Sequence, residues 1–259
     1  MPQKESDRKI GLARALSKLG YCSRSQATEL IRAGRVYLNG SLRRDPESPV
    51  RLEKDHITVD GHAVESKQQI YLMMNKPRGL VTTASDEKGR GTVYDILGTD
   101  KSLPWIAPVG RLDKASEGLL LLTNDSEWGA RIAAPDTHLE KVYHVQIGIV
   151  ADDNFVQSLV NGVRSEDGDV LRARRARLLR AGEKNCWLEI TLDEGKNRQI
   201  RRMLSALDVE VLRLVRVAIG PLHLGKLAKG AHRPLTSEEK LSVDRAMVTK
   251  QPQDFLREP

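Results

Sequence analysis

The chain has 259 residues, enough for one large domain or for a large and a small one. Lys and Arg outnumber Asp and Glu by 42 to 35, and the resulting net charge of +7 favours an acidic polymer as partner. Its two cysteines, Cys22 and Cys186, lie far apart, and no stretch approaches the ~20 apolar residues that span a bilayer. A disulfide framework, a zinc site and a transmembrane helix are excluded, and we expect a cytoplasmic protein.

Two short helices are predicted near the start of the chain. Residues 1–8 have the polarity of a flexible tail, after which leucines recur at helical spacing until Gly20, which ends a first helix. Ser23 and Gln26 have the spacing of a capping box, which predicts a second helix. The favoured hairpin pairs Asn-Gly and Asp-Gly follow at 39–40 and 60–61. We therefore expect a small α+β module over residues 9–65.

The pattern changes after a polar linker at residues 65–69. Further strands are predicted at IYLMMNKP, GLLLLTND, KVYHVQIGIV, CWLEITLDEG and VLRLVRVAIGPLHL, and helices at SEWGARIAAP, DDNFVQSLVNGV and NRQIRRMLSAL. Regular βαβ alternation is absent, which favours an α+β fold: a mixed, largely antiparallel β-sheet flanked by helices over residues 70–240. Residues 241–259 are expected to form a short helix and a flexible tail.

A basic cluster is expected in the N-terminal module, where the capped helix meets the first hairpin. It consists of Ser23, Arg24, Arg32, Arg35 and Asn39. Arginine side chains and helix N-terminal amides bind phosphate, although charge alone fits a solvated surface better. The string LARALSKLGYCSRSQATELIRAGRVYLNG closely resembles the S4-like RNA-binding module, named after a ribosomal protein. That resemblance implies RNA binding by this cluster.

A second basic group lies on the predicted helix that follows Gly195. Its arginines, Arg198, Arg201 and Arg202, fall opposite an apolar stripe, and Asn197 suits the helix N-cap. A solvated basic face is one interpretation. The other is an arginine that reaches from the first turns into a cleft and pairs with a buried acid. The strand LRARRARLLR fits phosphate binding and a solvated strand edge equally well.

The stretch GRLDKASEGLLLLTND places one carboxylate, Asp113, beside Arg111 and just before the most apolar strand. By itself this indicates either a surface turn with an ion pair or a reactive acid at the end of a buried strand. Together with MNKPRGLV, EKVYHV and LDEGKNRQIRRML, in this order, it resembles the pseudouridine synthases of the RsuA family. These bacterial enzymes modify ribosomal RNA and usually carry an S4-like module. The resemblance runs from about residue 10 to residue 236.

The resemblance implies that Asp113 is the catalytic carboxylate of a uridine-to-pseudouridine isomerisation that needs no cofactor and no metal. Arg201 matches the basic residue that pairs with this aspartate, and Tyr143 matches a tyrosine that stacks on the target base. Taken alone, Tyr143 would be an ordinary strand residue. Further RNA contacts are expected from Lys76, Arg111, Arg198 and Arg202, with the target base flipped out of its stack.

Other functions remain as alternatives. A non-catalytic RNA-binding ribosome-assembly factor would keep the arginines but would not need the GRLD motif. An RNA methyltransferase would need a glycine-rich loop between a strand and a helix, and no G-x-G-x-x-G occurs. We expect a monomer that acts on ribosomal RNA or on an assembly intermediate, with 23S favoured over 16S RNA and no membrane partner.

Overall fold

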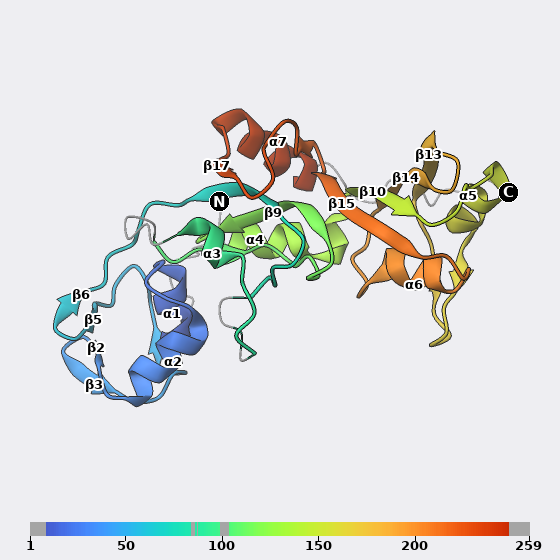
Figure 1. Cartoon of the computed structure of the whole chain (residues 1–259). Coiled ribbons are helices and arrows are strands. Elements are labelled where there is room, and N and C mark those ends of the chain that lie inside the picture. Colours follow the sequence, from blue (N-terminus) through green and yellow to red (C-terminus); the bar gives the residue numbers. More distant parts are fainter. Residues whose placement is uncertain (1–8, 84–85, 87, 99–103, 249–259) are drawn as a thin grey trace, which may run out of the picture. The chain divides into compact units, whose positions relative to one another are not determined.

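The computed structural model describes residues 9–83, 86, 88–98 and 104–248 (Figure 1). The expected tails over residues 1–8 and 249–259 lie outside this part. The chain forms two compact units. Of the described residues, the first unit takes in 9–71, 104–107 and 122–127, and the second holds the others.

The first unit contains the two predicted helices and the two predicted hairpins. Its elements are β1 (Ile10–Gly11), α1 (Leu12–Lys18), α2 (Arg24–Arg32), β2 (Val36–Leu38), β3 (Ser41–Arg43), β4 (Pro49–Val50), β5 (Ile57–Val59) and β6 (His62–Ala63). Four strands form an antiparallel sheet in the order β3-β2-β5-β6. Asn39 and Asp60 both adopt φ 51°, and each is followed by a glycine with positive φ, as a tight hairpin turn requires.

The second unit is built on one mixed sheet with the order β13-β14-β10-β15-β9-β7-β17. Its strands are β7 (Tyr71–Lys76), β8 (Ala107–Pro108), β9 (Glu117–Thr123), β10 (Lys141–Ile147), β13 (Arg175–Ala181), β14 (Cys186–Leu192), β15 (Val211–Ile219), β16 (Leu222–His223) and β17 (His232–Pro234). β11 (Val163–Arg164) and β12 (Val170–Leu171) form a separate hairpin. The expected α+β class with a mixed, largely antiparallel sheet is confirmed (Figure 1).

β9 lies inside the sheet, and every one of its residues is buried. It runs parallel to β15, with Gly118 opposite Arg216. Gly118 has φ 102°, and a Cβ built there would lie 2.2 Å from the backbone oxygen of Arg216. Only glycine permits this close approach of the two strands.

Helices flank the sheet of the second unit. They are α3 (Tyr94–Leu97), α4 (Ser126–Ala133), the 3-10 helix η2 (Pro135–Thr137), α5 (Asp153–Asn161), α6 (Gln199–Ser205) and α7 (Ser237–Val248). Apolar side chains of α5 and α6 share one core with β10, β14 and β15. No helix in the described part of the chain is long and apolar enough to cross a membrane.

Residues 241–248, in the range expected to hold a short helix and a flexible tail, form the second half of helix α7. α7 continues to Val248, its Val243 is 0% exposed, and Asp244 accepts a 2.8 Å hydrogen bond from the indole Nε1 of Trp128 in α4. These contacts make the segment part of the second unit. The sequence did not predict these contacts, because most residues of the segment are polar and their partner, α4, lies more than 100 positions earlier in the chain.

Candidate active site

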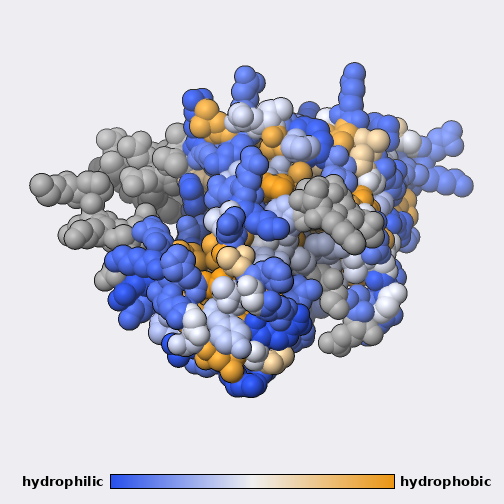
Figure 2. All heavy atoms as spheres, turned by 90° about the vertical axis from the view of Figure 1, so that its left-hand side faces the viewer, coloured by the Kyte–Doolittle hydropathy of each residue, from blue (hydrophilic) through white to orange (hydrophobic). Residues whose placement is uncertain are grey.

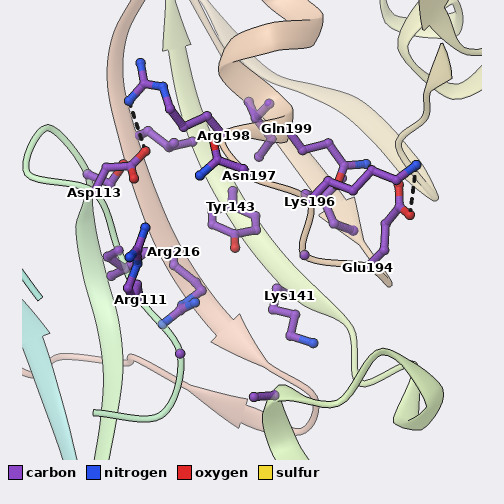
Figure 3. Close-up of a pocket in the computed structure, with 18 of the residues that line it drawn as sticks. Arg111, Asp113, Lys141, Tyr143, Glu194, Lys196, Asn197, Arg198, Gln199 and Arg216 are labelled. Atoms are coloured by element: carbon purple, nitrogen blue, oxygen red, sulfur yellow. Dashed lines mark hydrogen bonds and ion pairs between the residues drawn. The ribbon is translucent and has the colours of Figure 1, made fainter. Parts of the chain in front are cut away.

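A cavity of about 670 Å³ lies in the second unit, between β10, β15, the segment before β9 and the segment that leads into α6 (Figure 3). Of the predicted site residues, it brings together Arg111, Asp113, Tyr143, Arg198 and Arg201. These residues come from three separate segments of the chain: the loop before β9, strand β10 and the start of α6. The cavity therefore supports the interpretation of Asp113 as a positioned acid rather than as part of a surface turn.

Asp113 forms an ion pair with Arg198, whose Nη1 lies 3.2 Å from its Oδ2 (Figure 3). The sequence predicted Arg201 as the partner. Instead, Nη2 of Arg201 donates a 3.1 Å hydrogen bond to the backbone oxygen of Ala115, in the same loop. Arg198 takes this place because it is the N-cap of α6, where Asn197 was expected. Its backbone there adopts φ 48°.

Arg201 nevertheless lies in the electric field of Asp113. Burial lowers the pKa of Arg201, and neighbouring Arg198 lowers it further, whereas the negative charge of Asp113 raises it. Its Nε is buried without a hydrogen-bond partner among the described residues. Two arginines thus place positive charge near Asp113: Arg198 by an ion pair with its carboxylate, and Arg201 by a hydrogen bond to its loop.

The loop that carries Asp113 is fixed along its backbone, because each of the five carbonyl oxygens from residue 112 to residue 116 accepts a hydrogen bond. In chain order the donors are Thr82 Oγ1, Lys76 Nζ, Gly79 N, Arg201 Nη2 and Lys76 Nζ, at 2.7, 3.2, 2.8, 3.1 and 2.9 Å. The loop leads directly into buried β9, so its far end is also anchored. A carboxylate held in this way has the preorganisation that catalysis requires.

Lys76 was predicted to bind RNA, and the structure contradicts this. The side chain is 0% exposed, and its Nζ donates hydrogen bonds to the backbone oxygens of Pro77, Asp113 and Ser116. Burial lowers the pKa of Lys76 to about 8, against the opposing effects of Asp113 and Glu117. Lys76 therefore positions the Asp113 loop.

Tyr143 lines the cavity from β10, in the centre of Figure 3. In the sheet it lies opposite Arg216 of β15. Lys141 is two residues earlier on β10, so it shares the strand face of Tyr143, and it also lines the cavity. An aromatic ring with cations beside it is a suitable environment for a nucleotide.

Comparison with known proteins agrees with this geometry. Residues 70–206 match the family model described as RNA pseudouridylate synthase, and residues 10–57 match the S4 domain. The chain belongs to the RNA pseudouridylate synthase family.

Relatives of similar length support this membership. An uncharacterized RNA pseudouridine synthase of Aquifex aeolicus is 37% identical, over 93% of this chain and 96% of the relative. A protein of Bacillus subtilis named ribosomal large subunit pseudouridine synthase B is 36% identical, over 88% and 93%. A crystal structure of a pseudouridylate synthase matches with a TM-score of 0.63 at 29% identity, covering 90% of this chain and 99% of that one. The chain is thus a pseudouridine synthase, an isomerase that acts on RNA.

Two other predicted RNA-binding arginines of the synthase differ in their surroundings. Arg111 is exposed and lines the cavity. Arg202 lies outside the cavity lining and forms ion pairs with Asp167 and Asp169, at 2.5 and 2.8 Å. Arg202 thus contacts the hairpin of β11 and β12, because it projects from α6 in a different direction from Arg201.

In the S4 module, three of the predicted residues support local structure. Ser23 caps α2 with the expected capping box. Arg35 donates to Asp60 at 2.8 Å, and Asn39 donates to Asp55 at 2.9 Å from its turn. Arg24 and Arg32 are exposed. The face drawn in Figure 2 is largely hydrophilic, with smaller hydrophobic patches.

Sequence reasoning missed Thr82, Lys141 and Arg216. A signal existed for the last two, because each is a cation within an otherwise apolar strand pattern. Thr82 gave no such signal, since its role depends on a fold that brings it to Leu112: its Oγ1 both donates to the oxygen of Leu112 and accepts from its nitrogen.

Proposed function

We propose that this synthase isomerises a specific uridine of ribosomal RNA, with 23S favoured over 16S RNA. The observation that carries the proposal is Asp113, held by its backbone at a cavity lined by Tyr143. The names of large-subunit synthases among the relatives support the choice of ribosomal RNA.

In the proposed reaction, the N1–C1′ bond of the target uridine breaks, the uracil rotates, and a C5–C1′ bond forms. The hydrogen released from C5 is balanced by a proton gained at N1, so the product is an isomer and no co-reactant is needed. Asp113 acts on the ribose, either as a nucleophile that attacks the sugar or as a base that removes a proton from it. Arg198 pairs with its carboxylate, and Arg201 holds the loop that carries it.

The uridine must leave its stack to reach Asp113. Tyr143 stacks on the flipped base, and exposed Arg111 contacts the phosphate or fills the place that the base leaves. The S4 module, through Arg24 and Arg32, supplies further contacts to the RNA backbone. The enzyme acts as a monomer, on free ribosomal RNA or on an assembly intermediate.

The test is a pseudouridine map of both ribosomal RNAs, by carbodiimide labelling and primer extension, in cells that lack the gene. We expect one stop to disappear and to return with the wild-type gene but not with Asp113→Asn. A map with every stop in place would contradict the proposal and favour an assembly factor.

A further inference from the structure

Two cations of the cavity have no role in the reaction proposed above. Arg216 is 6% exposed, and its Nε donates a 2.8 Å hydrogen bond to the oxygen of Leu119. Its Nη2 is buried without a hydrogen-bond partner in the described part of the chain. Lys141 reaches into the same cavity from β10 (Figure 3). A buried charge without a counter-charge is costly unless a ligand compensates it.

The two cations lie close enough to repel each other. Burial lowers the pKa of Lys141 to about 8, and the charge of Arg216 contributes to this, whereas Asp193 opposes it. Tyr143 neighbours both of them, since it lies opposite Arg216 on β15 and two residues after Lys141 on β10. The pair therefore adjoins the place proposed for the target base.

The acidic residues around the cavity are engaged with other cations. Asp113 pairs with Arg198, Glu194 with Lys196, and Asp193 with Arg174. Within the described residues, neither Arg216 nor Lys141 forms an ion pair with a carboxylate. The cavity thus offers two positive charges near Tyr143 that form no ion pair with a carboxylate of the described residues.

We propose that Arg216 and Lys141 form an anion subsite that binds a phosphodiester group next to the target uridine. The inference rests on the proposed function, because an RNA substrate brings a phosphate on each side of the flipped nucleotide. A guanidinium offers several fixed donors to phosphate oxygens, and the ammonium of Lys141 adds a mobile point charge. The subsite differs from Arg111 in its burial, because Arg111 is exposed whereas Arg216 is buried and Lys141 is half-buried.

The first experiment measures trace acetylation of lysines in the full chain at pH 8, mapped by mass spectrometry. The probes are inorganic phosphate, uridine 5′-monophosphate and uridine, and exposed Lys184, in the turn between β13 and β14, is the control. We expect phosphate and the monophosphate to slow acetylation of Lys141 several-fold and uridine to have little effect. Equal protection by uridine would assign the place to the base, and no protection by any probe would also overturn the proposal.

The second experiment measures RNA binding against salt in the Asp113→Asn background, so that it needs no turnover. Lys141→Gln should weaken binding and lower the slope of log K against log salt by about 0.7 to 0.9, the value for one phosphate contact. Lys184→Gln should leave the slope unchanged. An unchanged slope for Lys141→Gln refutes the subsite, whereas a missing isomerase activity of the wild type would refute the proposed function instead. Arg216→Gln is the companion variant, and the test stands on Lys141→Gln if that variant does not fold.

Discussion

The ammonium of Lys76 donates a hydrogen bond to the backbone oxygen of Asp113 at 3.2 Å, across 37 positions of the sequence. A buried cation from β7 thereby fixes the loop on which the acid lies. Lys76 makes no hydrogen bond to the Asp113 carboxylate itself among those described, so it contributes to the position of the acid and not to its chemistry.

Replacing Lys76 should therefore separate rate from RNA binding. Lys76→Met removes the donor of three carbonyl oxygens, and the loss of each buried partner costs about 1–3 kcal/mol, partly offset because no charge is buried. We expect kcat to fall while RNA affinity stays within a few-fold, with a lower free energy of unfolding. Lys184→Met, at an exposed position, is the matched control. A loss of RNA affinity with kcat unchanged would contradict this role and indicate that Lys76 binds RNA.

The pH dependence of stability offers a second test of Lys76. The pKa of Lys76 is about 8 in the folded protein, against its ordinary value of 10.5. Below pH 8 Lys76 is therefore protonated in both the folded and the unfolded protein, and folding bears the full free-energy cost of burying its charge. Between pH 8 and 10.5 the unfolded chain binds more protons, and the free energy of unfolding rises with pH. Urea unfolding at pH 7 and pH 10 should show the wild type gaining stability relative to Lys76→Met. Parallel pH curves would contradict the assignment.

Asp113→Asn should abolish isomerisation, a loss of about 10⁴-fold or more, because the amide can neither attack the sugar nor accept its proton. The release of tritium from RNA labelled at C5 of uridine measures the reaction. Affinity for the RNA should stay within a few-fold of the wild type. Measurable turnover in this variant would remove Asp113 from the catalytic role.

The two arginines near Asp113 should differ in their effect on kcat. Arg198 and Asp113 are 50% and 30% exposed, and such pairs contribute at most about 1 kcal/mol, so Arg198→Ala should cost less than about fivefold. Arg201→Ala removes a charged hydrogen bond to the loop, worth about 1.5–3 kcal/mol, or about 10- to 100-fold in kcat. Single-turnover rates would check the order, and a larger loss for Arg198→Ala would reverse the assignment.

In the S4 module, the double substitution Arg24→Gln with Arg32→Gln should weaken RNA binding and lower its salt slope by up to about 1.8, for two phosphate contacts. Both side chains are exposed, so the fold should be unaffected. Filter binding across a salt series measures the slope. Binding and slope equal to those of the wild type would exclude these two residues from the interface.

Local features of the fold were predictable from the sequence, because they depend on residues near one another. The capping box of Ser23 and Gln26 and the turn at Asn39 belong to this group. The parallel contact of β9 with β15 was not predictable, because it joins segments about 100 positions apart through Gly118.

The sequence predicted the candidate catalytic carboxylate of the site, but not the residues that hold its loop in place. Asp113 follows from a long motif that the family model also covers. The burial of Lys76 and the left-handed backbone of Arg198 depend on tertiary packing, which no pattern of neighbouring residues encodes. For this reason the sequence assigned the ion pair with Asp113 to Arg201.

The hydrogen bond between Arg201 and Ala115 spans 86 positions, so the loop of Asp113 leaves the ribosome long before its last donor is synthesised. Until α6 has emerged and docked, the acid has neither of its arginines. A chain that ends before residue 198 would therefore keep the whole first unit but lack both arginines beside Asp113.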